Sequence, residues 1–98
     1  MIRVIYEWYV VPENLEAFSE AWQQTTTLVR EVYQGAHGSC LLKDSKDAHT
    51  VLTIARWNSE DDWRTFWSSE NPPEVTQMSK LARLKDIKIY EEIGHFKA

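Results

Sequence analysis

The chain has 98 residues, a net charge of −4 at pH 7 and a pI near 5.3. This length fits one domain over residues 1–98, and it leaves little room to bury every apolar face within one subunit. Lys and Arg are scattered along the chain, which argues against nucleic acid as a partner. No apolar run approaches the roughly 20 residues that a membrane-spanning helix requires, so we expect no membrane partner.

Cys40 is the only cysteine, so no disulfide can form within the chain. The strand-like residues 2–5 follow the first Met directly, without the basic and apolar regions of a secretory signal. We therefore expect a reducing, cytoplasmic location.

The first two predicted elements are a strand and a long helix. Residues 2–11 are rich in β-branched and aromatic side chains and end at Pro12, which predicts a strand. Apolar or semi-polar residues then recur at spacings of three and four from Leu15 to Val32, and Gly35 ends the pattern. This periodicity predicts a helix of about 20 residues.

A hairpin and a capped helix are predicted next. Residues 38–42 and 50–57 are strand-like and are joined by the polar turn 43–48. Ser59 and Asp62 have the spacing of a capping box, so the second helix is expected to begin near residue 60.

This second helix carries three large aromatic side chains, Trp63, Phe66 and Trp67, at positions i, i+3 and i+4. They share one stripe of the helix and must cover an apolar surface, which is either a core or a pocket.

After Pro72-Pro73, a short helix over 74–82 and a last strand over 87–96 complete the order β-α-β-β-α-β. This order predicts an α+β, ferredoxin-like fold, in which an antiparallel four-stranded sheet carries both helices on one face.

The first strand is apolar on both faces. One face carries Ile2, Val4, Tyr6, Trp8 and Val10, and the other carries Ile5, Tyr9 and Val11 around Arg3 and Glu7. A sheet with one solvated face should be polar at every second residue, so we expect another copy to bury the second face. A homodimer with its sheets face to face is the simplest closed arrangement.

The chain resembles the antibiotic biosynthesis monooxygenase (ABM) family of dimeric α+β barrels over essentially its whole length. The resemblance rests on Val11-Pro12-Glu13 followed by Phe18, on the segment 35–38 that opens the second strand, on Trp57-Asn58-Ser59 at the strand-helix junction, and on the Ile-rich last strand. It implies a dimeric barrel and a relation to cofactor-free oxygenases of anthrones and quinols or to haem-degrading enzymes.

The haem-degrading branch of the family relies on an Asn in the first strand, a Trp in the second helix and a His after it. Here the strand position is Tyr6 or Glu7, the helix offers Trp67, and residues 70–82 contain no His. Haem is therefore not expected. The glycines never form GxGxxG or a P-loop, so no flavin or nicotinamide cofactor is expected either.

The function implied by the resemblance is cofactor-independent oxygenation of a small electron-rich aromatic or quinol substrate. Such a site needs an apolar pocket with a few polar tips, because the ionised substrate itself passes an electron to O₂. The candidate substrate-binding residues are Tyr6, Trp8, Trp22, Trp63 and Trp67. For each residue alone, core filling is the stronger interpretation, whereas the clustering of all five favours a pocket. The alternative function is a non-catalytic dimeric module that binds a small apolar ligand or provides an association surface.

The remaining candidates are polar. His37 and Cys40 are expected to point to opposite faces of a strand, so no metal site is expected. His37 and Tyr6 are the candidate catalytic groups, although a solvated histidine is the simpler interpretation of His37. Arg56 either holds an anionic substrate group or pairs with Glu7, and we favour the pairing.

Overall fold

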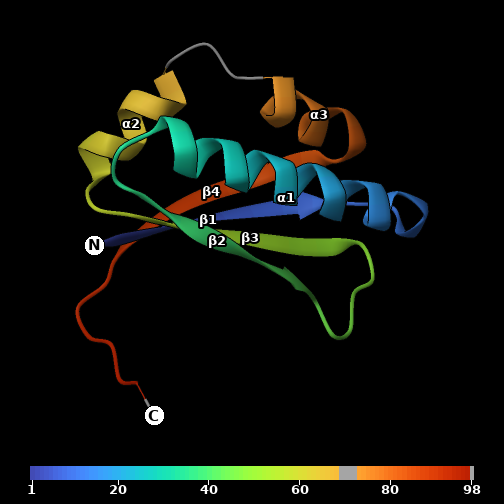
Figure 1. Ribbon diagram of the computed structural model, residues 1–98. Coiled ribbons are helices and arrows are strands. Elements are labelled where there is room, and N and C mark those ends of the chain that lie inside the picture. Colours follow the sequence, from blue (N-terminus) through green and yellow to red (C-terminus); the bar gives the residue numbers. More distant parts are fainter. Residues whose placement is uncertain (69–72, 98) are drawn as a thin grey trace.

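The computed structural model (Figure 1) describes residues 1–68 and 73–97. Its elements are β1 (Ile2–Tyr9), a 3-10 turn (Pro12–Asn14), α1 (Leu15–Val32), β2 (Ala36–Lys43), β3 (Thr50–Trp57), α2 (Glu60–Ser68), α3 (Pro73–Leu81) and β4 (Arg83–Glu91). The strands form one antiparallel sheet in the order β2-β3-β1-β4, and Figure 1 shows the three labelled helices on the same face. The ferredoxin-like α+β fold is confirmed.

β1 lies at the centre of the sheet. It pairs with β3 from Ile2 opposite Trp57 to Tyr9 opposite Thr50, and with β4 along its other edge. Because side chains alternate between the faces of a strand, every second residue of β1 points at the helices and is buried there. The largest fully buried side chains are Trp57, Phe18, Val4, Val10 and Val51.

No helix among the described residues covers the opposite face of the sheet, called the open face below, and the sheet does not close into a barrel within one chain. Ile5, Leu52 and Ile54 lie half-buried on this face, while Leu42 and Tyr90 are 46% and 52% exposed. None of the described helices has the length and apolar character needed to cross a membrane.

The last strand differs from the prediction. It spans Arg83–Glu91 instead of 87–96 and follows α3 almost directly. Ile2, the first residue of β1, pairs with Glu91, and Met1 O accepts the hydrogen bond of Glu92 N at 3.0 Å. The strand therefore ends where its neighbour ends.

The prediction that the second helix begins near residue 60 is confirmed. Ser59 Oγ accepts a hydrogen bond from Asp62 N at 3.2 Å, and α2 begins at Glu60. The Asp62 side chain packs on Gly35, which has a φ of +95°. The connection before β2 and the start of α2 therefore fit closely together.

Candidate functional site

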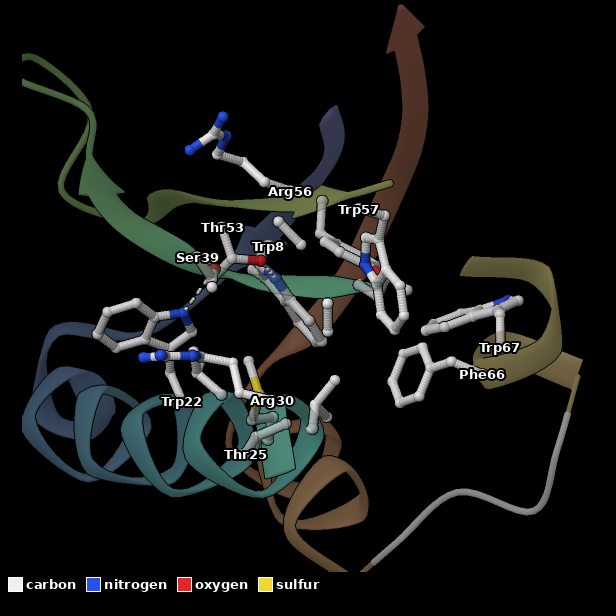
Figure 2. A pocket seen from close by; sticks show the side chains of 18 of the residues that line it. Trp8, Trp22, Thr25, Arg30, Ser39, Thr53, Arg56, Trp57, Phe66 and Trp67 are labelled. Atoms are coloured by element: carbon white, nitrogen blue, oxygen red, sulfur yellow. Dashed lines mark hydrogen bonds between the residues drawn. The ribbon is translucent and has the colours of Figure 1, made fainter. Parts of the chain in front are cut away.

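A cavity of about 110 Å³ lies between the helix-bearing face of the sheet and the helices α1, α2 and α3 (Figure 2). For comparison, an engineered apolar cavity of about 150 Å³ holds one benzene molecule, so the space encloses about one aromatic ring. The cavity is partly open to solvent, so the rest of a larger ring system would extend through its open side. Its lining includes Tyr6 and Trp8 from β1, Trp22 from α1 and Trp67 from α2. Trp63 and His37 do not contribute to the lining.

One end of the cavity is aromatic, formed by Trp57, Phe66 and Trp67 (Figure 2). The ring centroids of Trp57 and Phe66 are 5.4 Å apart, and those of Phe66 and Trp67 are 6.2 Å apart. The Tyr6 ring lies 5.6 Å from Trp67. Such closely packed rings offer flat apolar surfaces to a planar ligand.

Tyr6 contributes a phenol that is neutral at physiological pH. Its hydroxyl accepts a hydrogen bond from Trp63 Nε1 at 2.8 Å, and Trp63 is itself buried. Burial raises the pKa of Tyr6 to about 12, and the Trp63 hydrogen bond opposes this rise only in part. Tyr6 is therefore a hydrogen-bond donor at neutral pH and cannot serve there as the proton-accepting base. Trp63 does not line the cavity itself, but its hydrogen bond holds the Tyr6 hydroxyl in position.

The other end of the cavity is polar. Trp22 Nε1 donates to Ser39 Oγ at 3.0 Å, and Thr25 Oγ1 donates to the Ala21 carbonyl at 2.7 Å. Figure 2 shows the Arg30 side chain at this end, beside Trp22. Deeper in the sheet, Trp8 Nε1 donates to Thr53 Oγ1 at 3.0 Å, which satisfies the buried indole.

Arg56 lies beside the cavity only through its backbone, because Figure 2 shows its side chain pointing away from the cavity across the sheet. The predicted pairing of Arg56 with Glu7 is wrong. Arg56 Nη2 lies 3.8 Å from Glu92 Oε2, and Arg3 Nη2 donates a hydrogen bond of 2.9 Å to Glu92 Oε1. Glu7 Oε2 lies 3.8 Å from Lys85 Nζ instead. Glu92 directly follows β4 and lies beside the start of β1, so its carboxylate can contact both Arg3 and Arg56. The Arg3 hydrogen bond lowers the pKa of that carboxyl.

His37 is exposed and lies in the irregular pairing between Ala36 and Gly38 at the start of β2. Its Nε2 lies 2.5 Å from Asn58 Oδ1. His37 does not line the cavity. Among the described residues, the ionisable side chains that lie at the cavity are therefore those of Tyr6 and Arg30. The described residues hold no group of three or more His, Cys, Asp and Glu side chains that could bind a metal ion.

The sequence profile of the antibiotic biosynthesis monooxygenase family matches residues 1–76, more than three quarters of the chain. The chain belongs to this family. No curated protein matches it.

Solved structures show the same ABM fold. SnoaB from Streptomyces nogalater, a cofactor-independent oxygenase, is 15% identical with a TM-score of 0.76, over 99% of this chain and 97% of SnoaB. Rv0793 from Mycobacterium tuberculosis is 14% identical with a TM-score of 0.72, over 98% of each chain. A candidate antibiotic biosynthesis monooxygenase from Caulobacter crescentus is 13% identical with a TM-score of 0.79, over 95% of this chain and 90% of that one. At these identities the similarity establishes the fold and leaves the reaction open.

Sequence reasoning missed several lining residues of this ABM protein, chiefly Trp57, Phe66, Ser39 and Arg30. For Trp57 a signal existed, because it shares the alternation of Val51 and Thr53 on β3 and so faces the helices. No sequence signal placed Ser39 or Arg30, since their meeting depends on how α1 crosses β2.

Proposed function

We propose that this chain is a cofactor-independent oxygenase of a small electron-rich aromatic or quinol substrate, bound in the cavity between the helices and the sheet. The observation that carries the proposal is the cavity itself, with stacked aromatic rings at one end and the neutral Tyr6 hydroxyl in its wall. Membership of the ABM family supports an oxygenase, and the shared fold of SnoaB, a cofactor-independent oxygenase, supports the absence of a cofactor.

In the proposed reaction, the ionised substrate transfers an electron to O₂ and the resulting radical pair forms a carbon–oxygen bond. In an anthrone, collapse of the peroxide converts the CH₂ group to a carbonyl, and the second oxygen atom leaves as water. In a hydroquinone, the same collapse at a ring C–H carbon gives a hydroxyquinone and water. Tyr6 donates a hydrogen bond to the substrate oxygen, because its own oxygen already accepts from Trp63 and its proton remains available. The aromatic end excludes water and aligns the ring.

No carboxylate or imidazole stands among the described residues that line the cavity, so the substrate must enter already ionised or lose its proton to water. This requirement selects acidic substrates such as anthrones and hydroquinones, whose anions are stabilised by conjugation.

The test is oxygen uptake by the purified protein with a panel of hydroquinones and anthrones. Trp67→Ala, which removes a ring from the aromatic end, should lower the rate about tenfold or more, because a misplaced substrate loses its alignment. Val32→Ala is the matched control, because Val32 is 63% exposed at the end of α1 and lies outside the cavity lining. Absence of substrate-dependent uptake by the folded protein would refute the proposal for these substrates.

A second candidate function is a non-catalytic module that binds a small aromatic ligand. The lack of a proton-accepting side chain in the described cavity lining favours it over an enzyme that uses its own base. Under this alternative, the hydroquinones bind to the protein but their oxidation is no faster than in buffer.

We further propose a homodimer formed through the open face, in the cytoplasm. The half-buried Ile5, Leu52 and Ile54 on this face support the dimer, because a second copy would remove them from water. The single cysteine, Cys40, supports a reducing compartment.

A further inference from the structure

The two ends of the cavity differ in chemistry, and this difference bears on the ligand. Figure 2 shows Trp57, Phe66 and Trp67 at one end and Trp22, Ser39 and Arg30 at the other. A ligand that fills the cavity therefore has one apolar planar end and one polar end.

Among the described residues, Arg30 is the only cation whose side chain lies at the cavity, at its edge beside Trp22, since the Arg56 side chain lies on the open face. Arg30 has no salt bridge within the described part of the chain, and its side chain is exposed. The Cδ atom of Arg30 lies 3.8 Å from the position that a Cβ would occupy on Gly38. The aliphatic part of the Arg30 side chain therefore lies over Gly38 of β2, which has no side chain. An unpaired guanidinium at the edge of an apolar cavity provides a place for an anion.

Ser39 adds a second donor at the same end. Its hydroxyl oxygen accepts the hydrogen bond of Trp22 Nε1, which leaves the hydroxyl proton for another acceptor. Within the described residues, no protein group accepts that proton. A guanidinium and a free hydroxyl proton together suit the two oxygen atoms of a carboxylate, at the end of the cavity opposite the substrate oxygen that Tyr6 would bind.

We propose that the cavity selects planar aromatic anions, with Arg30 and Ser39 binding the anionic group and the rings of Trp57, Phe66 and Trp67 binding the aromatic part. This inference rests on the site of the proposed function and names its substrate class. Arg30 acts as a specificity-determining residue in a protein whose overall charge is −4, so the preference for anions arises locally.

The test uses a matched pair of redox-inert probes, 2-naphthoate and 2-naphthamide, which share their shape and differ in charge. Isothermal titration calorimetry at low ionic strength should show the naphthoate binding about tenfold more tightly than the amide to the wild-type protein. Arg30→Gln should abolish this preference by weakening naphthoate about tenfold while leaving the amide unchanged. Arg30→Lys should retain part of it, since the charge remains but the planar fork is lost.

Lys46→Gln is the control, because it removes the same charge from the exposed hairpin turn far from the cavity, and it should leave both affinities unchanged. Ser39→Ala provides a second variant and should weaken naphthoate severalfold. The inference is overturned if neither probe binds the wild type, if both bind equally, or if Arg30→Gln keeps the wild-type preference.

Oxygen uptake measured on the same preparations separates this inference from the proposed function. Discrimination that depends on Arg30 without any oxygen uptake would leave the inference standing and remove the oxygenase. Oxygen uptake with hydroquinones that carry a carboxylate and with those that lack one alike, unaffected by Arg30→Gln, would do the reverse.

Discussion

Trp63 donates its indole N–H to the Tyr6 hydroxyl over 2.8 Å, and this hydrogen bond joins α2 to the central strand β1. Both residues are almost fully buried, with exposed fractions of 4% and 8%. Neither group can exchange its partner for water without opening the helix-sheet interface. The bond therefore holds α2, and with it the aromatic end of the cavity, against the sheet.

Tyr6→Phe should lower the free energy of unfolding by about 1–3 kcal/mol, because the buried Trp63 N–H would lose its acceptor. Urea unfolding followed by tryptophan fluorescence measures the change. Tyr9→Phe is the control, since Tyr9 is 38% exposed and its ring contacts remain, and it should change stability by less than about 0.5 kcal/mol. Equal effects of the two substitutions would contradict the structural role of this bond.

The contribution of Tyr6 to the free energy of unfolding should decrease at alkaline pH. Its pKa is raised from 10.0 to about 12 in the folded protein, so the unfolded chain loses this proton first as the pH rises. The contribution is complete below pH 10 and is lost between about pH 10 and 12, by about 2–3 kcal/mol in total. The measurement is the difference in unfolding free energy between wild type and Tyr6→Phe, followed from pH 9 upward. A difference that stays constant through pH 11 would show that the tyrosine titrates normally.

Gly35→Ala should destabilise the protein by about 1–3 kcal/mol. Gly35 has a φ of +95°, and an added Cβ would lie 2.5 Å from Asp62 Oδ2. Thermal unfolding followed by circular dichroism tests this, with Gly94→Ala as the control because nothing lies within 4 Å of a Cβ there. Adding Asp62→Ala should recover part of the loss by removing the clash while the backbone strain remains. If Gly35→Ala is as stable as Gly94→Ala, the connection before β2 and the start of α2 do not pack as closely as described.

Ile54→Asp should convert the proposed dimer to a monomer, because it places a charge in the middle of the apolar open face, opposite Ile5 on β1. Light scattering at low micromolar concentration measures the mass. Val32→Asp adds the same charge to an exposed position on α1 and should leave the mass at twice the subunit. A wild-type protein that is a compact monomer at this concentration would refute the dimer.

Local pattern was sufficient to predict most of the fold. The alternation of buried residues in β1, the spacing of the apolar residues in α1 and the Ser59 cap of α2 each depend on hydrogen bonds or periodicity within a few residues. These features can be predicted from a single sequence because the residues that determine them are close together along the chain.

The site was only partly predictable for the same reason. Tyr6, Trp8, Trp22 and Trp67 were candidates because aromatic residues on the facing sides of the sheet and the helices must meet in the layer between them. Whether a ring lines the cavity or fills the core depends on how deeply its helix sits on the sheet.

The amino-acid sequence by itself determined the order of the elements, the face of each strand that is buried and the crowding of aromatic residues between helices and sheet. Only the tertiary structure decided that Trp63 stands behind Tyr6, that Arg56 meets Glu92 rather than Glu7, and that Arg30 and Ser39 share one end of the cavity. Contacts of this kind join residues on different elements, and their geometry is set by the packing of whole helices and strands, which no short stretch of sequence encodes.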